Sequence, residues 1–162
     1  MTADEIRILF DYSYWATERI LRTALLVTPE QFNAPNTSSH GSLRGTLFHT
    51  LTADITWRTR LEHVDRPTES MCATPKEMQT VWAAEETRML SYLQNLSDAD
   101  LPADVSYKNS KGVPFEEPLW QILMHMLNHG TQHRAEAAAM LTDFNHSPGD
   151  VDMILYFREK AL

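Results

Sequence analysis

Residues 120–144 read WQILMHMLNHGTQHRAEAAAMLTDF and contain no proline. Apolar side chains recur there at spacings of three and four, which predicts a long amphipathic helix. Three histidines, His125, His129 and His133, follow one another at steps of four residues. Side chains at that spacing share one face of a helix, with their Cβ atoms about 5–6 Å apart. Two neighbouring imidazoles on this helix are therefore close enough to hold one cation.

A helical wheel distinguishes the three histidines. At about 100° per residue, His133 falls within the main apolar sector and His129 lies at its edge. His125 is displaced a further ~40° toward the polar flank. His129 and His133 are therefore the predicted inward pair. The apolar sector consists of Leu119, Met126, Ala137, Met140 and Phe144.

Two inward imidazoles need partners, because a buried polar group costs free energy unless it is hydrogen-bonded or coordinated. A divalent transition metal would satisfy both, since neutral imidazole is a common protein ligand of such metals. Alternatively, each imidazole is a core side chain bonded to a carbonyl or a carboxylate. The helix pattern leaves both interpretations open. It also supplies only two ligands, so a metal site would need a third from elsewhere in the chain.

Composition narrows the class of protein. The chain has 162 residues, 43% hydrophobic and 22% charged, which suits a single soluble globular domain over residues 1–162. No apolar run approaches the ~20 residues that a membrane-spanning helix needs, and the first residues do not resemble a signal peptide. Cys72 is the only cysteine, which excludes an internal disulfide and fits a reducing compartment. We therefore expect a cytoplasmic protein without a membrane partner.

The charge of the chain argues against nucleic-acid binding. The formal net charge is −8, whereas a nucleic-acid surface needs clustered Lys and Arg to displace counterions. The 14 basic residues are scattered, and Arg58, Arg60 and Arg66 come nearest to a cluster. We expect no DNA or RNA partner and attribute the acidic excess to solubility.

Helix signals divide the first quarter of the chain. Thr2 and Glu5 fit a capping box that begins a long helix reaching about residue 27. Thr28 and Pro29 signal one short helical turn. Residues 33–41 follow as a polar loop.

A second long helix is predicted over residues 42–63, where leucine and isoleucine recur at a spacing of four. His49 lies in this helix, but the wheel places it well away from the apolar stripe and toward Trp57. Periodicity alone therefore does not select His49 as a ligand. The stripe consists of Leu43, Leu47, Leu51 and Ile55.

The rest of the chain predicts two further long helices separated by a hairpin. Thr74 and Pro75 begin a third long helix, residues 75–96. Over residues 104–116 the apolar period changes to two, which predicts a small β-hairpin with Val105 and Tyr107 facing Val113 and Phe115. The histidine helix follows, and a short C-terminal helix is predicted from Ser147 through about Phe157. The expected fold is all-α: an up-and-down four-helix bundle with a hairpin before its last long helix.

Several short motifs follow one another in a distinctive order. They are LFHTLTAD (residues 47–54) with Trp57 and Arg58, HGTQHR (residues 129–134) and SPGDVD (residues 147–152). Near the start, residues 11–19 read DYSYWATER. The ordered set resembles the DinB family of bacterial metal-binding four-helix bundles, whose first helix usually has Asn where Thr17 stands here. The similarity covers nearly the whole chain.

The resemblance implies a divalent metal, zinc or nickel in most members, held by one histidine of the second helix and two of the fourth. Those positions correspond to His49, His129 and His133, which supplies the third ligand that periodicity could not identify. Members of the family commonly form homodimers. The family name refers to induction by DNA damage and does not imply DNA binding.

A three-histidine site would leave the full charge of the cation and at least one position open for water, thiolate or carbonyl oxygen. A structural zinc site is instead closed by a fourth protein ligand, usually cysteine, and only Cys72 is available. Asp54 and Glu136 are candidates to orient the imidazoles, although a salt bridge would explain either residue equally well. The mouth of the site has four candidate lining residues, with packing or a surface salt bridge as alternatives: Tyr12, Trp57, His125 and Arg134.

An open metal site favours catalysis over a structural role, and the superfamily that the chain resembles includes thiol-dependent transferases and isomerases. The preferred hypothesis is a metal-dependent enzyme that joins a low-molecular-weight thiol to a small electrophilic substrate. Metal-activated hydrolysis is an alternative, because it requires only the same open Lewis acid. A non-catalytic metal-binding or stress-response protein is a third. The sequence identifies no catalytic acid or base.

Overall fold

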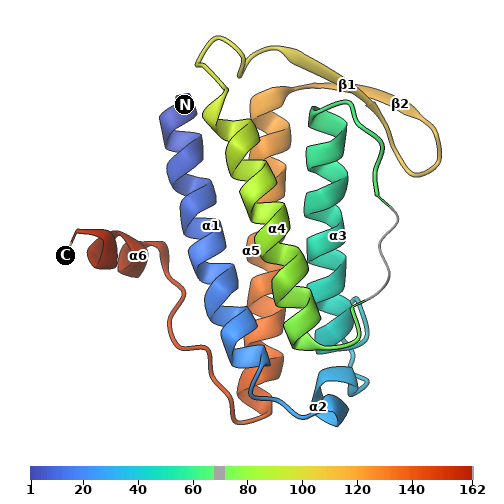
Figure 1. Ribbon diagram of the computed structural model, residues 1–162, viewed down its shortest axis with the longest axis vertical. Coiled ribbons are helices and arrows are strands. Elements are labelled where there is room, and N and C mark those ends of the chain that lie inside the picture. The colour runs from blue at the N-terminus through green and yellow to red at the C-terminus, as the bar shows by residue number, and fades with distance from the viewer. Residues whose placement is uncertain (68–71, 162) are drawn as a thin grey trace.

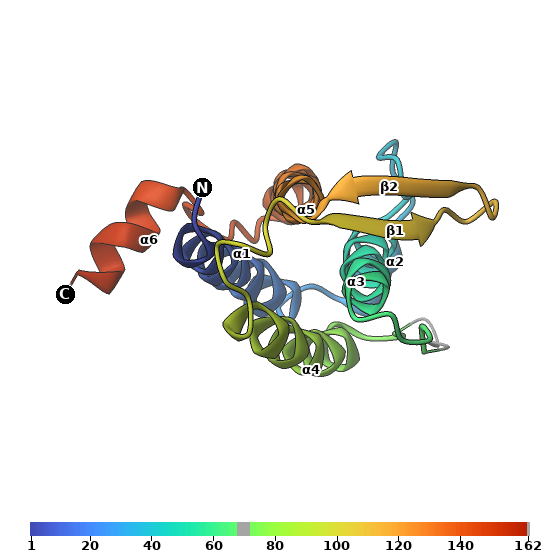
Figure 2. The ribbon, with the colours of Figure 1, turned by 90° about the horizontal axis from the view of Figure 1, so that it is seen from above.

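In the computed structural model, which describes residues 1–67 and 72–161, four long helices pack side by side. They are α1 (Ala3–Ala24), α3 (Leu43–Leu61), α4 (Pro75–Gln94) and α5 (Leu119–Asp143) (Figure 1). Around the bundle, α5 lies between α1 and α3, and α4 lies between the same two helices on the opposite side (Figure 2). The predicted four-helix bundle is therefore confirmed.

The direction of α4 departs from strict up-and-down alternation. Arg44, near the start of α3, donates to the carbonyl of Cys72, just before α4, and Arg58, near the end of α3, pairs with Glu85 in the second half of α4. The two helices therefore run parallel. The chain between them, residues 62–74, is long enough to return along the bundle, because an extended residue spans about 3.3–3.6 Å and a helical residue only 1.5 Å.

Local capping explains where these helices begin. The Thr2 side chain accepts from the backbone N–H of Glu5 at 3.1 Å, and the Glu5 carboxylate accepts from the N–H of Thr2 at 2.8 Å. The side chains of Ser42 and Thr74 accept from the amides of Gly45 and Glu77 and so cap α3 and α4, which satisfies amides that the first helical turn leaves unpaired. Thr28 caps the single turn of α2 (Pro29–Asn33).

The core consists of two apolar clusters, one toward each end of the bundle. The cluster near α2 contains Phe32, Leu47 and Trp82, and the cluster near the hairpin contains Phe10, Met89 and Leu123. Buried polar and charged side chains lie between these two clusters. We call this group the polar layer; it includes Thr17, Arg58, Glu85, His133 and Arg134.

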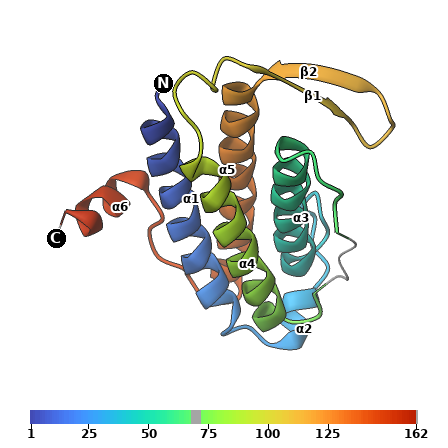
Figure 3. The same ribbon diagram turned by 45° about the horizontal axis from the view of Figure 1, so that its top comes forward.

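A two-stranded antiparallel hairpin, β1 (Asp104–Lys108) and β2 (Pro114–Pro118), covers one end of α3 and α5 (Figure 3). Tyr107 pairs with Phe115 as expected, but Val105 pairs with Glu117, and Val113 lies in the turn. The first amides of α5 have no side-chain cap. Instead, the N–H of Leu119 donates to the carbonyl of Ala103 at 2.9 Å, and that of Trp120 to Leu101 at 3.0 Å.

The last helix, α6 (Met153–Lys160), begins later than the sequence predicted. Gly149 has a φ of +72°, a left-handed conformation that a right-handed helix does not accommodate, so residues 147–152 form an irregular segment. The hydroxyl of Tyr12 donates to the carbonyl of Val151 at 2.9 Å and fastens this segment to α1. No helix within the described residues is both long and apolar enough to cross a bilayer.

Candidate metal centre

The seam between α3 and α5 gathers histidines at the level of the polar layer. On α5, His133 is buried at 8% exposure, His129 is half-buried and His125 is exposed. This is the order that the helical wheel predicted. His49 enters from α3, which packs against α5 along one face and α4 along another. That second packed face is why an imidazole outside the leucine stripe still lies inside the bundle.

Three ring nitrogens converge at this seam. The Nε2 atom of His129 lies 3.0 Å from Nε2 of His49 and 3.2 Å from Nε2 of His133. Nitrogens bound 2.0–2.1 Å from a tetrahedral zinc lie roughly 3.3 Å apart, so these separations suit a shared cation. Hydrogen bonding alone explains them poorly, because one Nε2–H of His129 cannot point well at both neighbours.

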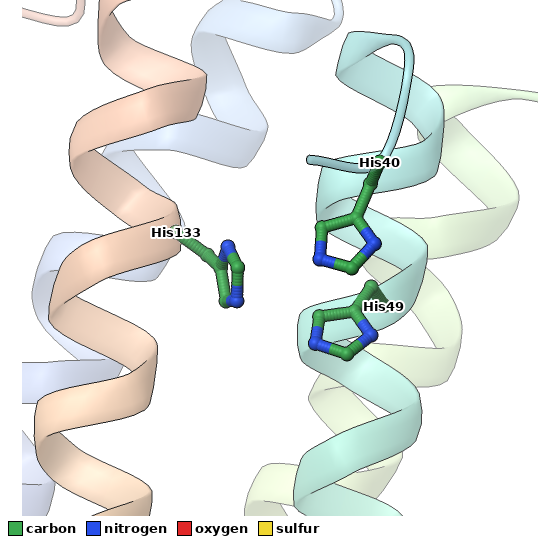
Figure 4. A group of neighbouring side chains, drawn as sticks. All are labelled: His40, His49 and His133. Atoms are coloured by element: carbon green, nitrogen blue, oxygen red, sulfur yellow. The ribbon is translucent and has the colours of Figure 1, made fainter. Parts of the chain in front are cut away.

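A fourth imidazole, His40, joins the cluster from the loop before α3. Ring nitrogens of His40, His49 and His133 all lie within 4.8 Å of one another, a three-histidine group that could hold a metal ion (Figure 4). The ring of His40 stacks on that of His49, with centroids 3.7 Å apart and planes at 15°. Sequence reasoning missed His40, because it stands in a polar loop where no periodicity indicates its direction.

The environment keeps the imidazoles of His40, His49 and His129 neutral. Burial, and next the neighbouring His40 and His133, lower the pKa of His49 to about 4. Burial followed by His133 and His49 lowers the pKa of His129 to about 4. The pKa of His40 is also lowered, chiefly by burial. Neutral imidazoles are the form that binds a metal, so the cluster is ready for a cation at neutral pH.

Glu136 orients His133. Its Oε2 lies 2.9 Å from Nδ1 of His133, and an ionised carboxylate only accepts hydrogen bonds, so Nδ1 carries the proton. The lone pair of His133 is then on Nε2, which faces His129. Carboxylates commonly orient metal-binding histidines in this way. Glu136 also accepts from the Ser39 hydroxyl at 3.4 Å, which connects it to the loop that carries His40.

Asp54 lies elsewhere in the polar layer. Among the hydrogen bonds of the described residues, none joins Asp54 to an imidazole. Burial raises the pKa of its carboxyl to about 7, against the lowering effect of Arg134. Some of its surface is exposed, yet protein atoms surround the carboxyl densely enough to disfavour its charge. The electrostatic effect of Arg134 connects Asp54 on α3 with α5, so the orienting role and the salt-bridge alternative both stay predictions.

Trp57 and His125 lie beside the cluster, toward the hairpin. Their ring centroids are 5.4 Å apart, and that of His125 is 5.8 Å from that of His129. They line a cavity of about 270 Å³ between α3, α5 and the hairpin. This cavity lies one helical turn from the converging nitrogens. Its other lining residues are Tyr107, Glu117, Gln121 and Ile122.

Tyr12 and Arg134 are the other two candidates for lining the mouth of the site. They lie on the side of α5 that faces α1, not on the side that faces α3. The Arg134 guanidinium donates to Ser13 at 2.7 Å and to Thr131 at 3.0 Å. It lies against Gly130, where an added Cβ would come within 2.8 Å of it. Tyr12 is engaged with the segment before α6. Both residues therefore bridge α1 and its neighbours.

Cys72 is separate from the histidine cluster. Its residue is buried at 6% exposure in the apolar core near α2. Within the part of the chain that the structure describes, the three-histidine group includes neither a cysteine nor a carboxylate. The donor set is therefore composed of imidazoles, which suits a divalent transition metal.

These features define the class of the protein as a helical bundle with a histidine cluster between two of its helices that could hold a metal ion. The sequence profile of the DinB family matches residues 2–160, so the chain belongs to the DinB family. Protein DinB of Bacillus subtilis (strain 168) is 23% identical in an alignment of length 160, and the match covers 91% of this chain and 91% of that protein.

Two solved structures share the fold. A DinB-like protein from Bacillus cereus is 20% identical, with a TM-score of 0.67, over 88% of this chain and 95% of that one. A conserved protein from Enterococcus faecalis is 17% identical, with a TM-score of 0.63, over 82% of this chain and 92% of that one. These likenesses concern the fold.

Proposed function

We propose that His49, His129 and His133 hold one divalent transition metal, zinc or nickel, and that the protein is a metal-dependent enzyme. The observation that carries this proposal is the approach of three Nε2 atoms from two helices to within 3.0 and 3.2 Å of their neighbours. Neutral imidazoles at this spacing favour a cation over any arrangement of hydrogen bonds among themselves.

The reaction that fits this site best is the transfer of a low-molecular-weight thiol to a small electrophile. When bound, the metal supplies a Lewis-acid position that keeps a thiol ionised at neutral pH. In the transfer, the thiol loses its proton and its sulfur forms a bond to carbon. A leaving group departs with its electron pair, or a proton is returned to carbon where the thiol adds to a double bond.

The residues around the seam supply orientation and a place for the second substrate. Glu136 keeps the proton of His133 on Nδ1 and so directs its Nε2 into the site. The cavity lined by Trp57 and His125 is close enough to receive an electrophile next to the bound thiol. Its aromatic walls suit a flat or apolar group.

Elemental analysis and a small substrate panel test the proposal together. Protein purified without an affinity tag should contain about one zinc or nickel per chain. Reconstituted protein is then assayed with thiols plus an electrophile, and separately with esters and amides. Turnover that requires both the thiol and the metal supports transfer, and turnover without thiol points to hydrolysis.

A result of a different kind would favour the non-catalytic alternative. Chelation would then lower the melting temperature strongly, while no member of the panel is converted at any metal loading. Light scattering on the same samples tests the homodimer that the family resemblance implies.

A further inference from the structure

We propose that His40 is a fourth ligand of this metal, placed by its loop at the position that the other three leave open, and that a substrate thiol displaces it. This inference rests on the proposed function. Four features support it: the position of the His40 ring, the fastening of its loop, the glycine on which the loop rests, and the chemistry of the exchange.

The ring of His40 is within reach of the site but not yet aimed at it. A ring nitrogen lies within 4.8 Å of donor nitrogens of both His49 and His133. Because the lone pair of an imidazole nitrogen lies in the ring plane, two rings stacked at 15° cannot direct lone pairs at one point. A rotation of the His40 side chain out of the stacked arrangement would be needed to turn the ring into a ligand.

Two side-chain contacts fasten the loop to α5, the helix that carries His129 and His133. Asn36 donates to the sulfur of Met140, and Ser39 donates to Glu136, the carboxylate that orients His133. Backbone bonds between Asn36 and Gly41 and between Gly41 and Ser38 close the loop on itself. His40 is therefore held beside the cluster by contacts that do not involve its own ring.

The loop that carries His40 packs directly on the backbone of α3 at Gly45. A Cβ at position 45 would overlap the backbone carbonyl of His40, so the loop can approach α3 only where the helix has no side chain. Gly45 lies in the first turn of α3, and glycine in a helix is less favourable than alanine, by about 1 kcal/mol at most. Glycine at position 45 therefore gives up some helix stability and in return allows the His40 loop to pack closely on α3. We infer that the position of this loop has a role.

A fourth imidazole changes which substrates can enter. A thiolate is a soft anion that binds zinc and nickel strongly, so it can replace a neutral imidazole, whereas water is a poor competitor. His40 would therefore hold back hydrolysis and admit thiol chemistry. It would also explain how a site with an exchangeable position remains closed in the absence of substrate.

His40→Phe separates ligation from stacking. Phenylalanine keeps an aromatic ring over His49 but has no nitrogen, so metal affinity should fall by at least the ~10-fold that loss of an outer partner costs. His146→Phe, a change at a histidine beyond α5, serves as the matched control and should bind like the wild type. Competition with a chromophoric chelator measures both affinities.

Gly45→Ala moves the loop without removing any imidazole. The substitution favours helix, so circular dichroism should be unchanged, while metal affinity falls in the same direction as in His40→Phe. With Co²⁺ as the probe, the visible bands of the site should shift in both variants as a solvent oxygen replaces the nitrogen of His40. Addition of 2-mercaptoethanol should perturb the wild-type cobalt spectrum, and at lower concentration in His40→Phe.

The outcomes are distinguishable. If the wild type binds no metal, the proposed function fails and this inference fails with it. If the wild type binds metal and both variants match it in affinity and cobalt spectrum, the proposed function stands and His40 is not a ligand. If 2-mercaptoethanol perturbs only the variants, His40 is a permanent ligand and displacement by thiol is refuted.

Discussion

Two buried polar clusters lie on different sides of α3, and only one of them is complete. Between α3 and α4, Arg58 donates to Glu85 at 2.5 and 3.0 Å and also pairs with Glu62. The buried guanidinium and the carboxylates of this cluster are paired with one another. In the histidine cluster between α3 and α5, the Nε2 atoms of three imidazoles face one another. The carboxylate of Glu136 binds His133 at Nδ1, the nitrogen on the other side of its ring.

The difference shows how a structural polar group can be told from a binding site. A buried ion pair that satisfies its own donors and acceptors needs nothing further. A cluster of imidazole nitrogens that cannot all pair with one another is satisfied by a shared cation. The following changes would break or sharpen this contrast.

The largest effect on stability is expected at the complete cluster. Glu85→Ala leaves the Arg58 guanidinium buried without its main partner, which should cost about 3–5 kcal/mol of unfolding free energy. Urea denaturation measures the loss, and metal affinity should be unchanged. Replacing both partners, Arg58→Met with Glu85→Leu, should restore most of the stability; if it does not, the pair contributes more than mutual compensation.

Removing one of the converging nitrogens should strongly weaken the affinity of the histidine cluster for its metal. His129→Ala is expected to weaken metal binding more than 100-fold, equivalent to about 2.7 kcal/mol, because the middle nitrogen of the three is lost. His125→Ala, on the exposed side of the same helix, should change affinity less than about threefold. Equal losses in both variants would contradict the assignment of the inward pair.

A smaller effect is expected from the carboxylate that orients His133. Glu136→Ala frees the imidazole to rotate or to change tautomer, and should weaken metal binding about 10–100-fold. Glu136→Gln keeps an acceptor for the Nδ1 proton and should lie between the alanine variant and the wild type. Isothermal titration of the metal-free proteins measures both, and wild-type affinity in Glu136→Ala would exclude the orienting role.

The smallest effect concerns pH and Asp54. Its pKa is raised from 3.8 to about 7 by burial, so as pH rises the unfolded chain loses this proton first, and stability decreases between about pH 4 and 7. Asp54→Asn cannot ionise and should gain a few degrees in melting temperature over the wild type at pH 8, but little at pH 4. The exposed Asp143→Asn should show no such trend; a parallel trend would assign the effect to net charge.

Local signals made most of the fold predictable. Caps such as Thr2 with Glu5 and the threefold and fourfold spacing of apolar residues depend on neighbours within one or two turns, and the structure has them where the sequence indicated. The inward direction of His129 and His133 was predictable for the same reason. It required only the geometry of one helix and the position of its apolar sector.

Features that depend on distant contacts were not predictable in this way. His49 lies on a second buried face of α3, and only the family resemblance indicated it. His40 depends on the absence of a side chain at Gly45 and on two contacts with α5, none of which has a sequence period. The parallel course of α4 follows from how far a connecting segment travels, which composition does not specify.

The start of α5 has a consequence for how freely the hairpin can vary. The amides of Leu119 and Trp120, just after the hairpin, donate to the carbonyls of Ala103 and Leu101, just before it. These bonds fix the rotation of the histidine helix about its own axis without involving the hairpin tip. The hairpin tip, residues 109–113, takes no part in these two hydrogen bonds. Loops of other lengths and compositions could replace the tip, and the histidine side chains of α5 would still point toward α3.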